Sequence, residues 1–316
     1  MAPIATPILL AAGVALDLAI GDPVYPFHPV RLIGWTLNQF ESALRRIKLD
    51  GYFGGILLFL LLTATWVGGT IALFQILNQY AAFALHLFLV YSLLALRDLL
   101  HHGYAVERSA ARNDTEGARK AIAMLVGRDT SQMDAAACRR AAIESLSENL
   151  TDGFVSPVFW YVLGGLPGLV LFKVVSTTDS MVGYKTPQYL RFGWCGARTD
   201  DLMNWIPARF TYALLAFVAL FIPGCSARKA LQVGWRQHAV VPGPNSGWSE
   251  AATAGAIQRK LIGPIWANGN LVTELWLGDP ADPPAGGDGD FPRAAHLNLA
   301  TGILASLIAI AVLVWL

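Results

Sequence analysis

The chain has 316 residues, of which 54% are hydrophobic and only 14% are charged, and its mean hydropathy is +0.46. Soluble domains carry about 25% charged residues, so this composition excludes an ordinary soluble domain and indicates a protein of the lipid bilayer. The net charge of +1 provides no basic face for nucleic acid. Cys138, Cys195 and Cys225 fall in no CxxC or Cys/His spacing, so we expect buried thiols rather than disulfides or a zinc site.

The first 20 residues are apolar but lack the basic segment that begins a signal peptide. They lead directly into Gly-Asp-Pro at 21–23. We therefore expect a first membrane helix that is kept in the mature protein.

A helix needs about 20 apolar residues to cross about 30 Å of hydrocarbon. Six segments approach this requirement: Ile4–Ile20, Ile56–Leu77, Ala81–Leu96, Phe154–Phe172, Ile206–Ile222 and Leu299–Leu316. Prolines and glycines interrupt 154–172, and 206–222 carries Pro207 and Arg209. We predict an all-α, polytopic membrane protein with five or six hydrophobic helical segments, one of them broken or re-entrant, in a single domain over residues 1–316.

The distribution of Lys and Arg bears on the topology. The polar stretches 21–55, 97–152 and 223–298 contain four, eight and six of these residues, and the positive-inside rule places all three stretches in the cytoplasm. Six complete crossings would put 173–205 on the opposite face. A broken segment at 154–172 that returns to its starting side avoids this, so we prefer a multi-pass protein of the cell inner membrane with a cytoplasmic active face.

Two polar stretches are expected to differ in structure. Residues 97–152 are rich in helix formers, and Ser131 with Asp134 resembles a capping box for a helix that runs toward Leu150. In the late loop we expect an Ala-rich helix at about Ser249–Lys260. A Pro/Gly/Asp-rich connector without a core pattern follows at about 278–293.

The first candidate site contains Glu144, Glu148 and Asp152, whose four-residue spacing stacks them on one face of a helix. Like charges in such a row repel by roughly a few tenths of a kcal/mol per pair, so a cation should compensate them. Arg140 lies one turn earlier and would make this face a solvated ion-pair stripe. With Asn149, the alternative is a polar pocket at a helix end.

The second candidate site is TTDSMVGYK at 177–185, which supplies hydroxyls, Asp179 and Lys185. Mg²⁺ is commonly held by one or two carboxylates together with substrate phosphates, and a nearby lysine acts on phosphates as a point charge. The alternative is a capped turn at a membrane surface. The chain contains no GxxxxGK[ST], so this is not a P-loop.

The third candidate site is RTDDLMNWIPAR at 198–209. Asp200 or Asp201 shares one helical face with Asn204 and offers oxygens to a hard cation. Arg198 and Arg209 flank these residues and can clamp anionic oxygens. The alternative is a helix N-terminus that favours acids through its dipole, although two adjacent aspartates beside hydrocarbon favour a functional site.

Three outer motifs are weaker candidates. His28 and Arg31 follow the first helix, and His28 is either a structural histidine or a base. Arg128 lies in the turn Gly-Arg-Asp-Thr at 127–130, which binds an anion or caps the next helix. The string NSGWSE at 245–250 opens the Ala-rich helix.

Taken in order, these motifs resemble the membrane cobinamide synthases of cobalamin biosynthesis (adenosylcobinamide-phosphate synthases, CobD/CbiB type). The likeness is in LDLAIGDPVYPFHPVRLIGW at 16–35, VGRDT at 126–130, RAAIESLSENLTDGFVSPVFWY at 140–161, STTDSMVGYK at 176–185, FGWCGARTDDLMNWIPAR at 192–209 and NSGWSEAATAGA at 245–256. Cys195 and Ser249 depart from the small residue and the proline that we expect at these positions.

The resemblance implies an ATP-dependent ligase that joins a propionate carboxylate of adenosylcobyric acid to (R)-1-amino-2-propanol or its O-phosphate, giving adenosylcobinamide (phosphate). It implies ATP and Mg²⁺ as cofactors and the corrinoid as a substrate. The expected partners are these small molecules, the lipid bilayer and other late corrinoid-pathway membrane enzymes, with no nucleic acid.

We assign the site residues on this basis. The metal ligands are expected to be Asp179, Asp200 and Asp201. The catalytic residues are expected to be Glu144, Glu148, Asp152, Asp179 and Lys185. The residues that bind the nucleotide or substrate are expected to be His28, Arg31, Arg128, Asn149, Lys185, Arg198, Asn204 and Arg209.

Two other functions remain open. An intramembrane prenyltransferase that uses Mg-diphosphate would explain DDxxN, but it needs a second Asp-rich motif, and TDSMVGYK is a poor one. A transporter would explain broken helices and buried acids, but it needs paired short helices in two matching halves, and we find no such symmetry.

Overall fold

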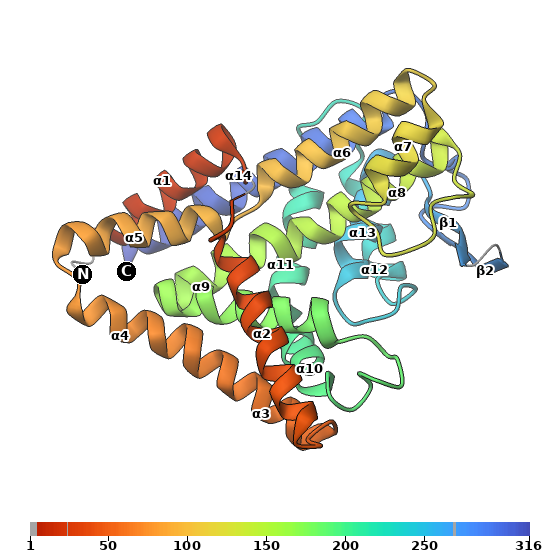
Figure 1. Cartoon of the computed structure of the whole chain (residues 1–316). Helices are drawn as coiled ribbons and strands as arrows, with labels where there is room; N and C mark the ends of the chain where they lie inside the picture. Colours follow the sequence, from red (N-terminus) through yellow and green to blue (C-terminus); the bar gives the residue numbers. More distant parts are fainter. Residues whose placement is uncertain (1–4, 24, 268–269) are drawn as a thin grey trace. The chain divides into compact units, whose positions relative to one another are not determined.

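The computed structural model describes residues 5–23, 25–267 and 270–316 (Figure 1). It divides into two compact units, each assembled from segments that are far apart in the sequence. Unit 1 comprises Met1–Ala95, Ser156–Asn204 and Ser306–Leu316, and unit 2 comprises Leu96–Val155 and Trp205–Ala305. The expectation of one domain over 1–316 stays a prediction.

Unit 1 is helical in its described part. Its elements are α1 (Ala5–Ile20), α2 (Pro29–Arg46), α3 (Tyr52–Thr63), the π-helical η1 (Ala64–Gly68), α4 (Gly69–Ile76), α5 (Gln79–Ser92), α9 (Ser156–Val182), α10 (Trp194–Met203) and the end of α14 (Asp290–Trp315). Its core is formed where α2, α3, the second half of α9 and Phe192 meet, and Leu37, Leu58 and Val174 are fully buried there.

In its described part, unit 2 combines helices with one β-hairpin. Its elements are α6 (Leu96–Ala111), α7 (Thr115–Ile122), α8 (Ala135–Leu150), the π-helical η2 (Thr151–Val155), α11 (Trp205–Val218), α12 (Ala227–Gln237), α13 (Ser246–Ile257), β1 (Leu261–Ala267), β2 (Asn270–Leu277) and most of α14. Asp134 is the N-cap of α8, because its Oδ1 accepts from the Ala137 amide at 2.7 Å. The capping box that we expected to begin at Ser131 is therefore wrong by three residues.

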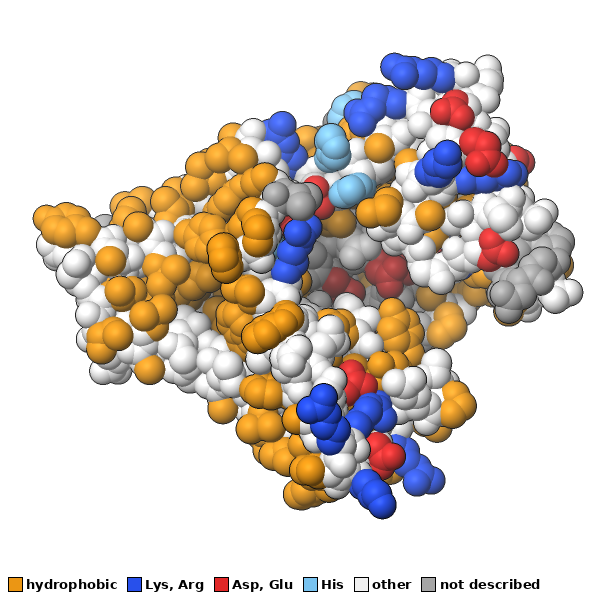
Figure 2. Space-filling view, viewed as in Figure 1, with side chains coloured by type: hydrophobic (Ala, Val, Ile, Leu, Met, Phe, Trp, Pro, Cys, Tyr) orange, Lys and Arg blue, Asp and Glu red, His pale blue; other side chains and the backbone are white. Residues whose placement is uncertain are grey.

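The membrane class is confirmed. Among the residues that the structure describes, four helices are by length and composition able to cross a bilayer: Tyr52–Ile76, Gln79–Ala111, Ala135–Val182 and Asp290–Trp315. Shorter apolar helices cover Thr6–Ile20 and Trp205–Val218, so each of the six expected segments corresponds to a helix. Figure 2 shows hydrophobic side chains gathered over the surface that α1, α4 and α5 form, as helices in contact with lipid require.

The interrupted segment is broken, as its glycines and prolines indicated. Gly165 has φ 59° and ψ −152°, which no helix contains, and Pro167 follows it. Gly168 packs so closely on Trp160 that a Cβ there would clash with the Trp160 carbonyl oxygen. Residues eight apart in a straight helix would be separated by about 12 Å. The chain therefore reverses near Gly165, and α9 is a helical hairpin.

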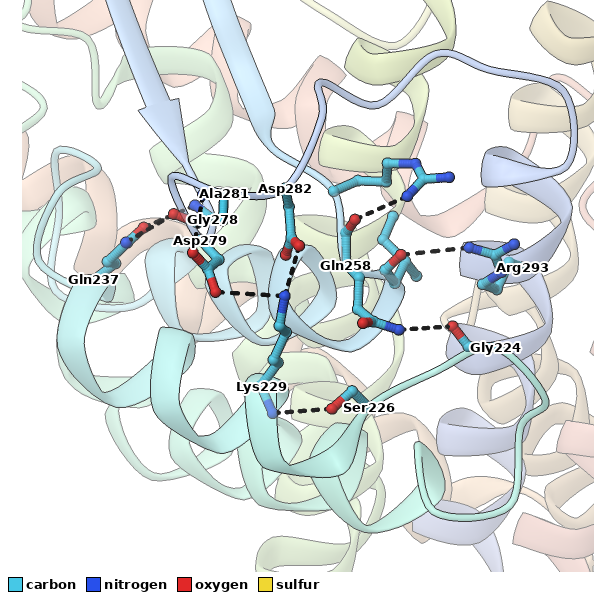
Figure 3. A network of polar contacts seen from close by, with 12 residues as sticks. Gly224, Ser226, Lys229, Gln237, Gln258, Gly278, Asp279, Ala281, Asp282 and Arg293 are labelled. Carbon is cyan, nitrogen blue, oxygen red and sulfur yellow. Dashed lines mark hydrogen bonds and ion pairs between the residues drawn. The ribbon is translucent and has the colours of Figure 1, made fainter.

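The all-α class is confirmed, and the described residues add one β-hairpin that the sequence did not predict. β1 pairs with β2 in antiparallel register, with Leu261 opposite Leu277 and a bulge between Ile265 and Trp266. The following connector is also more ordered than its composition indicated. Lys229 of α12 contacts Asp279 at 3.4 Å and Asp282 at 2.6 Å (Figure 3), so these partly exposed ion pairs fix the start of the connector on α12.

Candidate functional site

The first polar cluster lies in unit 1 where the end of α9 packs on α10. Its members are Asp179, Asp200 and Asp201, which we call the aspartate cluster. Two glycines permit the close packing. A Cβ on Gly193 would clash with the Val182 carbonyl, and a Cβ on Gly196 would clash with Thr178 Cγ2 at 2.6 Å. The loop 183–193 therefore returns the chain directly onto the last turns of α9.

Asn204 anchors this cluster. It is 1% exposed and ends α10 as its C-cap. Its Oδ1 accepts from Ser156 Oγ at 2.5 Å, and its Nδ2 donates to Asp200 Oδ2 at 3.0 Å. The expectation that Asp200 and Asn204 share one helical face is confirmed, and the hydrogen bond holds the Asp200 carboxylate in place.

The electrostatics of the aspartate cluster favour a cation. Burial, together with the charges of Asp179 and Asp201, raises the pKa of Asp200 to about 7. Three carboxylates with mutual repulsion would ionise more readily beside a positive ion. Across the described ranges, no three His, Cys, Asp or Glu side chains converge closely enough to hold a metal ion alone. The residues fit Mg²⁺ in the mode that adds substrate phosphates to one or two carboxylates.

The basic residues predicted near this cluster are exposed. Arg198 Nη1 lies 3.3 Å from Asp201 Oδ2, and the Arg198 side chain is 68% exposed. Lys185 is exposed in the loop between α9 and α10. Long basic side chains in such positions can swing toward an anion without losing a buried contact.

The second polar cluster lies in unit 2 and is the glutamate cluster: Arg128, Glu144, Glu148 and Glu250. Arg128 Nη2 lies 2.7 Å from Glu144 Oε2. A cavity of about 300 Å³ opens between α8 and the loop that follows α7, and Arg128, Glu144 and Glu148 line it. Glu144 and Glu148 therefore lie in a polar pocket, as one of the two interpretations of the 144–152 face expects.

Glu250 is the functional candidate that residue spacing missed. It is 2% exposed on α13, which packs on α8. Its Oε2 has no hydrogen-bond partner in the part of the chain that the structure describes. Burial, and then the charges of Glu148 and Glu144, raises the pKa of Glu250 well above its usual range. The string NSGWSE was the only sequence signal for this position.

The remaining residues of the 140–152 stretch have other roles. Arg140 is buried and donates to the carbonyls of Ile262 at 2.9 Å and Ala285 at 3.0 Å, so the solvated ion-pair stripe is wrong. Asn149 Nδ2 donates to the Ser145 carbonyl at 2.8 Å within α8. Asp152 lies in the π-helical η2, where the four-residue spacing is lost, and it is not part of the cavity wall.

Arg209 lies in unit 2 among aromatic rings. Its guanidinium is 4.2 Å from the ring centroid of Trp205 and 5.0 Å from that of Trp248. It also donates to Asn245 Oδ1 at 3.4 Å. The rings hold the planar guanidinium in place, and its fork of donors suits it to bind an anion through two parallel hydrogen bonds.

The structure favours a structural role for His28, in the motif after the first helix. This side chain is buried, and its Nε2 lies 3.0 Å from Asp22 Oδ1. Arg31 lies exposed on α2. The contact with Asp22 fixes the entry of the chain into α2.

The chain is similar to known proteins over most of its length. A family model described as "CobD/Cbib protein" matches residues 10–298. The cobalamin biosynthesis protein CobD of a Sinorhizobium species is 41% identical over 284 residues, which are 86% of this chain and 88% of the relative. The cobalamin biosynthesis protein CbiB of Salmonella typhimurium is 38% identical over 270 residues, which are 84% of each chain.

The CobD protein of Pelobacter propionicus is 40% identical over 281 residues, which are 87% of this chain and 85% of the relative. No solved structure matches the chain. Because the family model and these relatives cover most of its residues, the chain belongs to the CobD/CbiB family of cobalamin biosynthesis proteins.

Proposed function

We propose that this protein is an ATP-dependent amide ligase of cobalamin biosynthesis. It joins a propionate carboxylate of adenosylcobyric acid to (R)-1-amino-2-propanol or its O-phosphate and gives adenosylcobinamide (phosphate). Membership of the CobD/CbiB family supports a role for the chain in the corrinoid pathway. The observation that carries the ligase chemistry is the aspartate cluster, in which the buried Asn204 fixes the carboxylate of Asp200 among like charges.

The aspartate cluster is the proposed nucleotide site. Asp200 and Asp179, with Asp201, would hold Mg²⁺ together with phosphate oxygens, and the ion would supply neutralisation of the phosphate charge. Lys185 and Arg198 are exposed at this end of the unit and would contact the phosphates. Positioning and charge stabilisation provide most of the catalysis in phosphoryl transfer.

The glutamate cluster is the proposed amine site. A cavity of about 300 Å³ accommodates a small amino alcohol, and Glu144 and Glu148 in its wall attract an ammonium group. Arg128, held on Glu144 at 2.7 Å, limits the negative charge of the cavity and provides a donor for an anionic substituent of the amine.

The reaction needs activation because oxide is a very poor leaving group. The γ-phosphoryl group of ATP moves to the carboxylate oxygen, ADP leaves, and the neutral amine nitrogen attacks the carbonyl carbon. Phosphate then leaves with the electron pair of the C–O bond, and the nitrogen loses its extra proton. We place the active face on the cytoplasmic side of the inner membrane, where ATP is present.

The test measures ADP release by the detergent-solubilised protein with cobyric acid, with aminopropanol, with both and with neither. We expect ADP release and a new amide only when both substrates are present. Glu116→Gln on the surface of α7 is the control variant, because this side chain is 71% exposed and pairs with Arg119 at 3.1 Å. ADP release without amide would contradict the ligase, and turnover of a prenyl diphosphate would favour a prenyltransferase.

A further inference from the structure

Glu250 is the member of the glutamate cluster that does not line the cavity, and its surroundings are unusual. Its carboxyl group is 2% exposed, and its Oε2 lacks a hydrogen-bond partner within the described ranges. The charged groups that act on it are Glu148 and Glu144 of α8 and Arg128. From the other elements packed on α13, Arg209 and His238 contact the ring of Trp248. The Ser246 side chain hydrogen-bonds to this carboxyl group, but Oε2 still has no donor among the described residues and lies beside two further acids. This arrangement indicates a site that a cation completes.

We infer that Glu250 is a positioning residue for proton transfer: it forms a carboxyl pair with Glu148, and this pair receives the proton that the amine loses before amide formation. The inference rests on the proposed ligase function. Glu148 lines the cavity and would contact the amine, whereas Glu250 lies behind the wall on α13 and acts through Glu148.

The physical reason is the strength of the base. An ordinary glutamate has a pKa of about 4.3 and accepts a proton poorly from an alkylammonium ion. Burial and the charges of Glu148 and Glu144 raise the pKa of Glu250. Two interacting carboxyls titrate in two steps that belong to the pair. The upper step gives a dianion, and this dianion is a stronger base than either group alone.

The proton balance is simple. When the ammonium form of the substrate enters, its charge favours the ionised pair, and the pair gives one proton to water. One N–H bond of the ammonium then breaks, the proton moves to a Glu148 oxygen, and the nitrogen keeps the electron pair. That electron pair attacks the acyl carbon, and phosphate leaves with the electron pair of the C–O bond and takes up the second proton that the nitrogen loses. The carboxyl pair returns its own proton to water after the amide has left.

The test compares Glu250→Gln with wild type and with Glu116→Gln. For wild type, kcat/KM for the amine rises with pH through the upper step of the pair, because the free enzyme must be ionised to act as base. Glu250→Gln removes that step, so the acid limb moves down by roughly one pH unit or more, and kcat falls about 10- to 100-fold. Glu116→Gln leaves both unchanged.

Calorimetry supplies a second readout. Titration of aminopropanol into wild type in buffers of different ionisation enthalpy should show proton release, and Glu250→Gln should show less. A Glu250→Gln variant whose acid limb and proton release match wild type overturns the inference, even if its kcat is lower. If Glu250→Gln does not fold, Glu148→Gln decides by the same two measurements. If wild type forms no amide, the proposed function fails and the inference fails with it.

Discussion

The neutral substitution Asp200→Asn separates stability from activity at the aspartate cluster. Asp200 accepts from Asn204 at 3.0 Å, and an asparagine oxygen can accept the same hydrogen bond. The pKa of Asp200 is raised from 3.8 to about 7, so the folded protein keeps a proton that the unfolded chain loses. Stability therefore falls as pH rises from about 4 to about 7, and it is constant above this range.

The size of this effect follows from the shift. Each pKa unit corresponds to about 1.4 kcal/mol, but the Asp200 side chain is partly exposed and solvent screens it, so we expect about 1 to 2 kcal/mol. Asp200→Asn removes the penalty, and its stability relative to wild type should rise between pH 5 and pH 7. Thermal unfolding in detergent, followed by circular dichroism at several pH values, measures this difference.

Asp200→Asn should lose activity even though it gains stability. Without the Asp200 charge, substrate-dependent ADP release should fall by about 100-fold or more, because the Mg²⁺ that would neutralise the phosphate charge loses a carboxylate ligand. In wild type, nucleotide binding should weaken as pH falls below about 7, where Asp200 takes up a proton. Near-normal turnover of Asp200→Asn, or a stability difference that is the same at pH 5 and pH 7, would refute the reasoning.

Three further results are expected. Glu144→Gln removes one negative charge from the cavity and the 2.7 Å partner of Arg128, so the KM for the amine should rise about 10-fold in initial-rate measurements; an unchanged KM would exclude this cavity as the amine site. Gly168→Ala should lower the unfolding midpoint by the equivalent of about 1 to 3 kcal/mol, because its Cβ clashes with the first half of α9, whereas Gly164→Ala, with open space around its Cβ, should not. Equal midpoints would contradict the packing of the helical hairpin. Tyr184→Cys, in a background without native cysteines, should react with an impermeant maleimide from the cytoplasmic side only; periplasmic labelling would mean that 154–182 crosses completely.

The sequence was most informative where a local pattern has a local cause. Apolar runs near 20 residues identified the six hydrophobic segments, because hydrocarbon thickness sets this length. Prolines and glycines indicated the break in 154–172, which the backbone of Gly165 confirms. The spacing of Asp200 and Asn204 indicated a shared face, because four residues make about one helical turn. Each of these inferences needs only neighbouring residues.

The sequence was least informative where the same local composition is compatible with two different structures. Residues 261–277 are mostly apolar and short, so they could equally form a buried helix or a hairpin. The π-helical turn at 151–155 changed the helical spacing at its end, and the wall of the cavity therefore ends at Glu148 and leaves out Asp152. Local composition does not reveal either feature.

By itself, the sequence determined that this is a polytopic helical membrane protein with a broken segment and acids at defined helical spacings, because hydropathy and periodicity act within single elements. Only the tertiary structure decided which charges meet. Arg128 rather than Arg140 became the partner of Glu144, and Glu250, more than 100 residues further along the chain, came to lie beside α8. Pairings of this kind depend on how helices pack against one another, and no spacing within a helix encodes them.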